Sequence, residues 1–170
     1  PVKSSMHLRL NEVVIANDQK WAARHLSTIR HSYRKSAGLE EILAFLEPIL
    51  LNRPENLCHL NMELLMTLHT RLNLRSSVHV SSELNLGGVG TERLLRLCKH
   101  FNAETYLTGP AARAYLDAEA LRAQNVEVVW HQLTFPEYAQ LSDSFIPAMS
   151  FIDAVAAIGF DGLGAHFEGS

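Results

Sequence analysis

The residues best suited to chemistry lie between positions 81 and 91, where small polar side chains are followed by a glycine-rich loop. The polar run ends an apolar strand pattern, and the loop precedes a helix pattern. Ligands of open α/β sheets bind at the carboxyl ends of strands, and N–H groups at a helix N-terminus bind phosphate. This segment therefore predicts a ligand site. Its expected contacts are Ser81, Ser82, Gly88, Gly90 and Thr91.

Simpler interpretations of the same segment stay open. The loop lacks the Gly-Lys-Ser/Thr ending of a Walker loop and does not match G-x-G-x-x-G, so an ordinary turn with Thr91 as the helix N-cap is the alternative. Ser81 would need a histidine base to act as a nucleophile, and no G-x-S-x-G elbow is present. Contact with a ligand is therefore favoured over nucleophilic attack.

A second candidate site lies on a helix expected from Asp18, as its cap, to about Lys35. His25 and Thr28 stand at i and i+3 beside an apolar stripe, so they could border a pocket. A histidine there could serve as an acid or base near neutral pH. The alternative is a boundary histidine bonded to a carbonyl. The stripe consists of Ala22, Leu26, Ile29 and Tyr33.

Two further pairs of residues favour structural explanations. Ser150 and Asp153 match the Ser-x-x-Asp capping pattern, which accounts for both residues at the start of a helix. His59 and Glu63 stand at i and i+4 and could share a metal ion. A third ligand at a suitable spacing is missing, so the sequence predicts no metal site.

Apolar residues at strand or helix spacing define the elements that must position these residues. They predict strands over 8–16, 77–82, 104–108 and 126–131, and helices over 18–35, 39–51, 54–72, 91–101, 111–123 and 151–158. Short strand–helix connections imply parallel strands joined by right-handed crossovers. The predicted fold class is α/β, a layered domain with a mainly parallel sheet flanked by helices. One domain is expected over 1–159, with a polar, glycine-rich tail over 160–170.

Composition excludes several classes of protein. The net charge of −3 over 170 residues argues against nucleic-acid binding, which normally requires a basic excess. No apolar run approaches the roughly 18 residues of a membrane span. The two cysteines do not make a disulfide framework, so we expect them to be reduced in a cytoplasmic protein.

Four groups of residues, taken in order, resemble the WbqC-like family of bacterial proteins. They are Trp21…His25-Leu26-x-Thr28-Ile29…Tyr33-x-Lys35; Ser81-Ser82-Glu83-Leu84…Gly90-Thr91-Glu92-Arg93-Leu94; Thr105-Tyr106-x-x-Gly109-Pro110…Tyr115; and Phe145-x-Pro147-x-x-Ser150-x-Ile152-Asp153…Gly159. Each motif alone is weak, whereas four in this order and spacing are fairly specific. The resemblance covers the chain from Pro1 to about Gly159.

The resemblance implies a function in the synthesis of O-antigen or another surface polysaccharide. The implied reaction is transfer of an aminoacyl group, for example glycyl, or of an acyl group onto a sugar; the alternative is a non-catalytic binding or scaffold protein. The implied partners are small molecules, namely an activated donor, a nucleotide-sugar or a sugar acceptor, and no cofactor is specified. His25 and Glu83 are the candidate catalytic residues, because either could position or deprotonate the accepting amine. The family motifs add Arg93, Gly109, Tyr115, Ser150 and Asp153 to the candidate binding residues.

One departure from the family pattern concerns the start of the chain. Family members open with a strand and a Gln-Pro…Pro-x-x-Gly-Tyr segment, which Pro1 and the residues after it do not match. The resemblance therefore implies that the opening of the domain is lacking. An exposed sheet edge would result, and such edges pair with other chains. We expect a homo-oligomer formed through that edge as one way of covering it.

Overall fold

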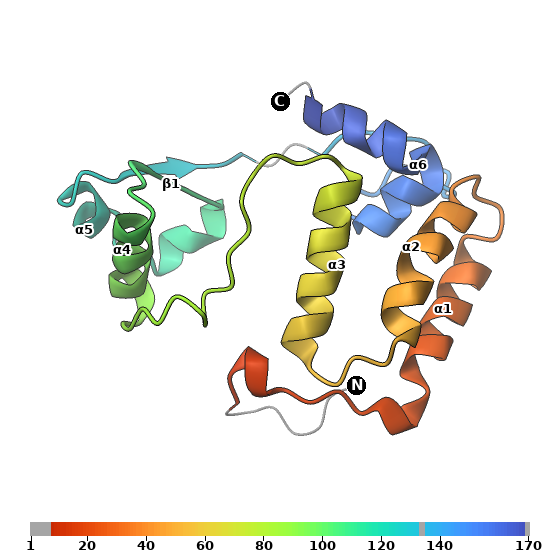
Figure 1. The fold of residues 1–170 in the computed structure, drawn as a ribbon. Coiled ribbons are helices and arrows are strands. Elements are labelled where there is room, and N and C mark those ends of the chain that lie inside the picture. Colours follow the sequence, from red (N-terminus) through yellow and green to blue (C-terminus); the bar gives the residue numbers. More distant parts are fainter. Residues whose placement is uncertain (1–7, 133–134, 169–170) are drawn as a thin grey trace. The chain divides into compact units, whose positions relative to one another are not determined.

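In a computed structural model of the protein, residues 8–132 and 135–168 are described. The chain forms two compact units (Figure 1). The first unit combines residues up to 78 with residues from 135 onward, and the second spans 79–134. The single domain expected over 1–159 stays a prediction.

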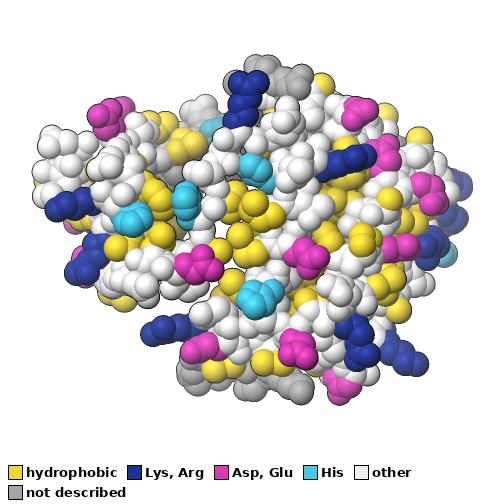
Figure 2. All heavy atoms as spheres, in the orientation of Figure 1, with side chains coloured by type: hydrophobic (Ala, Val, Ile, Leu, Met, Phe, Trp, Pro, Cys, Tyr) yellow, Lys and Arg dark blue, Asp and Glu magenta, His cyan; other side chains and the backbone are white. Residues whose placement is uncertain are grey.

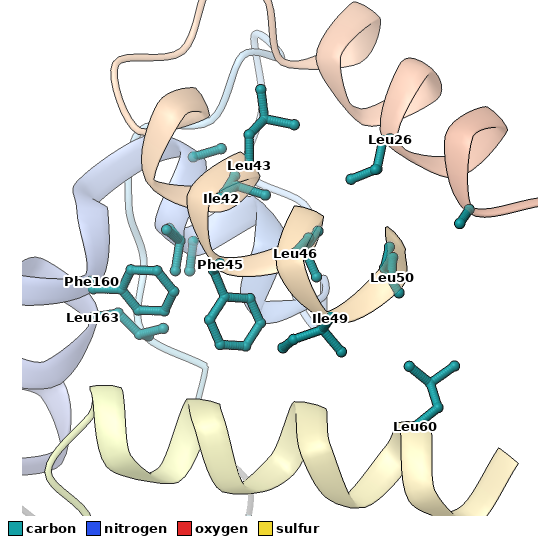
Figure 3. Close-up of a cluster of buried hydrophobic side chains, with 14 of the residues drawn as sticks. Leu26, Ile42, Leu43, Phe45, Leu46, Ile49, Leu50, Leu60, Phe160 and Leu163 are labelled. Atoms are coloured by element: carbon teal, nitrogen blue, oxygen red, sulfur yellow. The ribbon is translucent and has the colours of Figure 1, made fainter. Parts of the chain in front are cut away.

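The first unit is a helical assembly built around one central helix. After two short 3-10 helices, its α-helices are α1 (Trp21–Ser32), α2 (Leu39–Leu51), α3 (Leu57–Arg71) and α6 (Phe151–Glu168). Helix α2 packs against α1, α3 and α6. It can do so because apolar residues occupy most of its surface, including Ile42, Phe45 and Leu46, all of which are buried. A leucine stripe along α3 lies in or against this core, and Figure 3 labels one of its members, Leu60. The stripe consists of Leu57, Leu60, Leu64, Leu68 and, directly after the helix, Leu72.

The second unit holds the sheet. Its elements are α4 (Gly90–His100), β1 (Thr105–Thr108), the 3-10 helix η3 (Pro110–Ala114), α5 (Ala118–Arg122) and β2 (Glu127–Trp130). The two strands pair in parallel with Thr105 opposite Glu127 and Thr108 opposite Trp130. One face of the sheet is covered, because Val128 is buried with Cys98 of α4 and Leu121 of α5. The parallel strands predicted over 104–108 and 126–131 are thus confirmed.

The fold class is mostly helical, with a small sheet, rather than a domain layered around a large one. The described residues contain six α-helices and a two-stranded parallel sheet. The strand predicted over 8–16 is wrong. Val13 and Ile15 do alternate with exposed Val14, but this extended stretch meets residues 55–57 only at one isolated antiparallel bridge. The N–H groups of Leu57 and Ile15 complete it, donating to the carbonyls of Val13 at 3.0 Å and of Glu55 at 2.8 Å.

The strand predicted over 77–82 is also absent. Residues 77–80 are irregular and a turn follows over 81–85. Val78 remains 40% exposed. A strand needs a neighbour to satisfy its backbone groups, and the sheet described here has only β1 and β2. The sequence over 77–82 therefore has the apolar alternation of a strand, but no neighbouring strand pairs with it.

Several helix boundaries differ from the prediction. Lys20, not Asp18, is the N-cap of α1. The helix expected over 111–123 is divided into η3 and α5, and the Asp117 side chain caps α5. Helix α6 does not end at Gly159 but kinks there, at φ 70°, and continues to Glu168. Phe160 and Leu163 are buried in the core, which explains why residues 160–168 are helical rather than a polar tail.

Among the described residues, no helix combines the length and apolar character that a membrane crossing requires. Charged side chains of both signs are interspersed on the face seen in Figure 2.

Gly38, the residue before α2, should be sensitive to the addition of one methyl group. A Cβ atom at this position would lie 2.0 Å from the Val155 carbonyl oxygen of α6. We expect Gly38→Ala to lower the free energy of unfolding by about 1 to 3 kcal/mol or more, because backbone atoms must move apart. Gly164→Ala is the matched control, since a Cβ atom there meets nothing within 4 Å. It should leave stability unchanged or raise it by up to about 1 kcal/mol. Urea unfolding of both variants measures the difference, and equal stabilities would contradict the close packing of α2 on α6.

Candidate functional site

Asp153 is the one buried charged residue in the part of the chain that the structure describes, with 9% of its surface exposed. It lies in the first turn of α6. Carboxylates are rarely buried without partners, because removal from water penalises the charge. The partners of Asp153 therefore define the most unusual chemical environment in the first unit.

Three uncharged donors hold the Asp153 carboxylate. The Tyr33 hydroxyl donates to Oδ1 at 3.0 Å, while the Tyr138 hydroxyl and Gln140 Nε2 donate to Oδ2 at 3.0 and 2.8 Å. Gln140 is itself fixed by Ile146, whose N–H donates to Gln140 Oε1 at 2.7 Å. These bonds join the end of α1, the segment before α6 and α6 itself around one carboxylate.

The electrostatics of this cluster keep both tyrosines protonated. Burial, and then the hydrogen bond to the Asp153 carboxylate, raise the pKa of Tyr33 to about 12. Burial also raises the pKa of Tyr138; the bond from Gln140 opposes this rise and the one to Asp153 adds to it. The ion pairs found among the described residues all lie elsewhere. Asp153 is thus stabilised by neutral donors and not by a protein cation.

A cavity of about 180 Å³ opens beside the carboxylate. Polar and charged residues in its wall are Tyr33, Lys35, Ser36, Gln140 and Asp153, and alanines such as Ala156 and Ala157 complete it. The wall comes from residues 33 and 35–37 after α1, from residues 139–141 and from the first turns of α6. The cavity lies entirely within the first unit.

The capping prediction for Ser150 and Asp153 is half right. The Ser150 hydroxyl accepts from the Ile152 N–H at 3.4 Å, as a capping side chain does. The Asp153 side chain points to the tyrosines instead of returning to the Ser150 N–H, so its capping role is wrong. The sequence analysis did not select Tyr138 and Gln140 as site residues, because no local pattern links them to Asp153, which follows them by 15 and 13 positions.

In the second unit, Arg93 closes the glycine-rich loop onto α4. Its guanidinium donates to the carbonyls of Leu86 and of Ser81, the latter at 3.1 Å. Gly88 lies within this loop at φ 91°, in the left-handed region that favours glycine. The Arg93 side chain therefore holds the loop in shape, and its guanidinium is already hydrogen-bonded to loop carbonyls.

Thr91 does not cap α4, contrary to the simpler interpretation. The N-cap is Val89, which has no side-chain capping bond. The Thr91 hydroxyl instead accepts from the Asp117 N–H at 3.1 Å, which joins the N-terminal ends of α4 and α5. Gly109 directly follows β1, and a Cβ atom there or at Gly90 would meet nothing within 4 Å. Tyr115 is 74% exposed, so its side chain is accessible from solvent.

The two candidate catalytic residues lie in different units. His25 is exposed on α1, and its Nδ1 lies 2.9 Å from the Trp21 carbonyl oxygen. Thr28 likewise donates to the Arg24 carbonyl at 3.0 Å, so both residues match the alternative of a bond to the helix backbone. Glu83 is exposed in the turn over 81–85, together with Ser81 and Ser82. The catalytic and binding roles of these residues stay predictions.

Metal ligands do not gather in the described part of the chain, where no three or more His, Cys, Asp or Glu side chains are placed to hold an ion.

Comparison with known proteins identifies the family. The model of the WbqC-like protein family matches residues 1–164, so the chain belongs to that family. It is similar to the uncharacterized protein Rv1507c of Mycobacterium tuberculosis, with 31% identity over 160 residues. The match covers 93% of this chain and 69% of the relative. No solved structure matches.

The bond between Tyr33 and Asp153 makes a prediction about alkaline pH. The folded-state pKa of Tyr33, about 12, lies above the ordinary value of 10.0, so the unfolded chain loses this proton first. The stability contributed by Tyr33 is complete below pH 10 and is lost as the pH rises towards 12. An ultraviolet titration of tyrosinate should show a late phase whose amplitude Tyr33→Phe reduces by one tyrosine, while Tyr138, whose pKa is also raised, continues to titrate late. Tyr115→Phe, at an exposed position, should leave the amplitude of the late phase unchanged; an undiminished late phase in Tyr33→Phe would contradict the assignment.

Arg93 should control the order of the loop over 81–89. Lysine cannot donate to two carbonyls with the rigid fork of arginine, so Arg93→Lys should loosen the loop. We expect hydrogen exchange of the loop amides to quicken by about 10-fold or more. Arg122→Lys is the control, because Arg122 pairs with Glu119 on an exposed face of α5, where such pairs contribute little. Equal exchange in both variants would show that Arg93 does not hold the loop.

Proposed function

We propose that this protein is a transferase of surface-polysaccharide biosynthesis that moves an aminoacyl group, for example glycyl, or an acyl group onto a sugar. The observation that carries the proposal is the buried Asp153 carboxylate in the wall of a cavity. Membership of the WbqC-like family supports the biological setting. The proposed location is the cytoplasm, where activated donors and nucleotide-sugars are made.

The chemistry of Asp153 fits acyl transfer. An attacking amine or hydroxyl must lose a proton as its bond to the acyl carbon forms and the leaving group departs. A carboxylate offers about four acceptor positions, and three on Asp153 are used. Oδ1 accepts from Tyr33 alone, so it retains a position for the N–H or O–H of a substrate. The tyrosines, kept protonated, would hold the carboxylate in place while it receives that proton.

The loop of the second unit supports a separate role in binding the donor. The first turn of α4 has no side-chain cap, and glycines at positions 88 and 90 keep bulk away from its N–H groups. Such groups bind phosphate, which an activated donor or a nucleotide-sugar would carry. Glu92 also lies in this turn, paired with Arg96, so the donor site would have to accommodate its charge.

A non-catalytic binding or scaffold protein is the second candidate function. Its support is the exposed face of the small sheet, where Leu107 and Val129 are paired neighbours and are 61% and 37% exposed. Parallel sheets are normally covered on both faces, so an uncovered face with an exposed apolar pair supports a partner, although Thr105 and Glu127 on the same face are polar. A second copy of the chain, paired through a sheet edge, is one proposed partner.

Replacing one carboxylate oxygen tests the enzyme proposal. We expect Asp153→Asn to reduce transfer from aminoacyl or acyl donors to a sugar by about 100-fold or more, the usual contribution of an acid–base group. Asp161→Asn, on the exposed part of the same helix, should leave transfer unchanged. Thermal denaturation of each variant shows whether the fold survives.

A ligand screen identifies the substrates before activity is assayed. A ligand at 100 times its Kd stabilises the protein by about 2.7 kcal/mol, which for a chain of this size raises Tm by about 5 to 10 °C. ATP with magnesium, nucleotide-sugars, glycine and coenzyme A form the panel. A shift with a donor class supports the transferase. If no ligand raises Tm and the wild-type protein shows no detectable transfer activity, the binding protein is favoured.

A further inference from the structure

The second unit contains a cavity that neither proposed function uses. It opens between α4 and α5, towards the C-terminal ends of both helices, and its volume is about 700 Å³. This volume lies within the roughly 300–1,000 Å³ of pockets that hold drug-sized ligands, whereas the Asp153 cavity, at about 180 Å³, is smaller than that range. All of the lining residues lie between positions 95 and 126, so the second unit forms this cavity alone.

Small and apolar side chains form the inner wall of the cavity. Helix α5 has only 5 residues, whereas α4 has 11, so α5 cannot cover the whole apolar face of α4. Cys98 and Val126 are buried members of the core of this unit and also line the cavity. A ligand seated against them would remove apolar surface from water, which favours binding. The apolar lining consists of Leu95, Cys98, Ala103, Ala120, Ala123 and Val126.

Carboxamides supply the uncharged polar part of the wall. An asparagine in the left-handed region follows each helix, Asn102 at φ 50° after α4 and Asn125 at φ 59° after α5. The next N–H groups, of Ala103 and Val126, donate back to carbonyls of Cys98 at 2.8 Å and of Leu121 at 3.0 Å, so both turns are held in place. A carboxamide both donates and accepts hydrogen bonds, so these side chains suit an uncharged polar group.

The charges in the wall do not favour a ligand of either sign. Arg96 is paired with Glu92 at 2.6 Å. Lys99 and Glu104 carry opposite charges, and neither belongs to an ion pair found among the described residues. A charged ligand would lose part of its hydration on entering an apolar cavity without meeting a surplus of opposite charge. An uncharged ligand avoids that cost.

We propose that this cavity binds an uncharged organic molecule with an apolar body and one hydrogen-bonding end. The body would lie against Cys98 and the alanines, and the polar end would bond to Asn102 or Asn125. The site is separate from the proposed donor site, because α4 rises about 14 Å between Gly90 and Lys99. The ligand is therefore a further small-molecule partner of the chain, in addition to the donor and acceptor of the transferase.

Two fluorescent probes that share one ring system test the class of ligand. N-phenylnaphthylamine is uncharged, whereas anilinonaphthalene sulfonate carries a negative charge on the same rings. We expect the uncharged probe to bind the whole chain saturably, and the sulfonate to bind about 10-fold or more weakly, because its charge loses hydration on entry. Failure of the uncharged probe to bind, or equal or tighter binding of the sulfonate, would overturn the proposal.

Filling the cavity locates the site. Ala123→Leu adds bulk to the wall and should weaken binding of the uncharged probe by about 10-fold or more. Ala114→Leu, at an exposed position of the same unit outside the wall, should leave binding unchanged. Leu107→Ser should also leave it unchanged, because Leu107 lies on the uncovered face of the sheet. Binding that survives Ala123→Leu, or that Leu107→Ser abolishes, would overturn the inference.

A second variant and a measurement of mass complete the test. Gln124→Trp changes an exposed residue of the wall, so it blocks the cavity even if Ala123→Leu fails to fold. Sedimentation of the wild type and of Ala123→Leu should give the same mass. A wild-type dimer that Ala123→Leu dissociates would show that a second copy of the chain fills the cavity instead, which would overturn the proposal.

Discussion

The first unit depends on one buried carboxylate that joins segments far apart in the sequence. Tyr33 stands 120 positions before Asp153, while Tyr138 precedes it by 15. Between these partners the chain leaves to form the second unit and returns. Bonds to a charged group contribute about 1.5–3 kcal/mol each, and loss of one would leave buried charge uncompensated. The carboxylate therefore fixes where the returning chain enters the unit, and it does so beside a cavity.

The packing of α6 on α2 is what brings Asp153 into that position. Gly38 lets the backbone of α6 approach closely, and its N–H donates to the Ala156 carbonyl at 3.1 Å. Further along α6, the kink at Gly159 leaves the N–H of Phe160 without a helical partner. This N–H donates instead to Glu41 Oε2 of α2 at 3.1 Å. A side chain of α2 thus satisfies the backbone of the second arm of α6. Both arms are held to the same helix, and the apolar residues after the kink remain in the core.

The local sequence pattern was enough to predict elements that bury one face. It failed where contact with a distant segment determines whether an element forms. The stripe on α3, the bounds of α2 and the parallel pair β1 and β2 follow from periodicity alone. The segments at 8–16 and 77–82 have strand periodicity but lack a neighbouring strand, which no local signal reveals. The same limit applies to the site. Asp153 could be selected from its motif, but its tyrosine and glutamine partners could not, and they determine that its side chain faces a cavity instead of capping a helix.

The small sheet imposes a different constraint on the second unit. Two parallel strands are marginally stable alone, and here helices α4 and α5 cover one face, where Cys98, Leu121 and Val128 are buried. The other face keeps Leu107 and Val129 in contact with water. Strand β1 carries no charge or proline along its four residues, Thr105 to Thr108, and those are the features that usually protect an edge from pairing. A catalytic role for Asp153 gives no reason for Leu107 and Val129 to remain exposed on this face, beside Thr105 and Glu127, whereas association with another protein surface does. The binding-protein proposal therefore rests on the sheet of the second unit, whereas the catalytic carboxylate of the transferase proposal lies in the first.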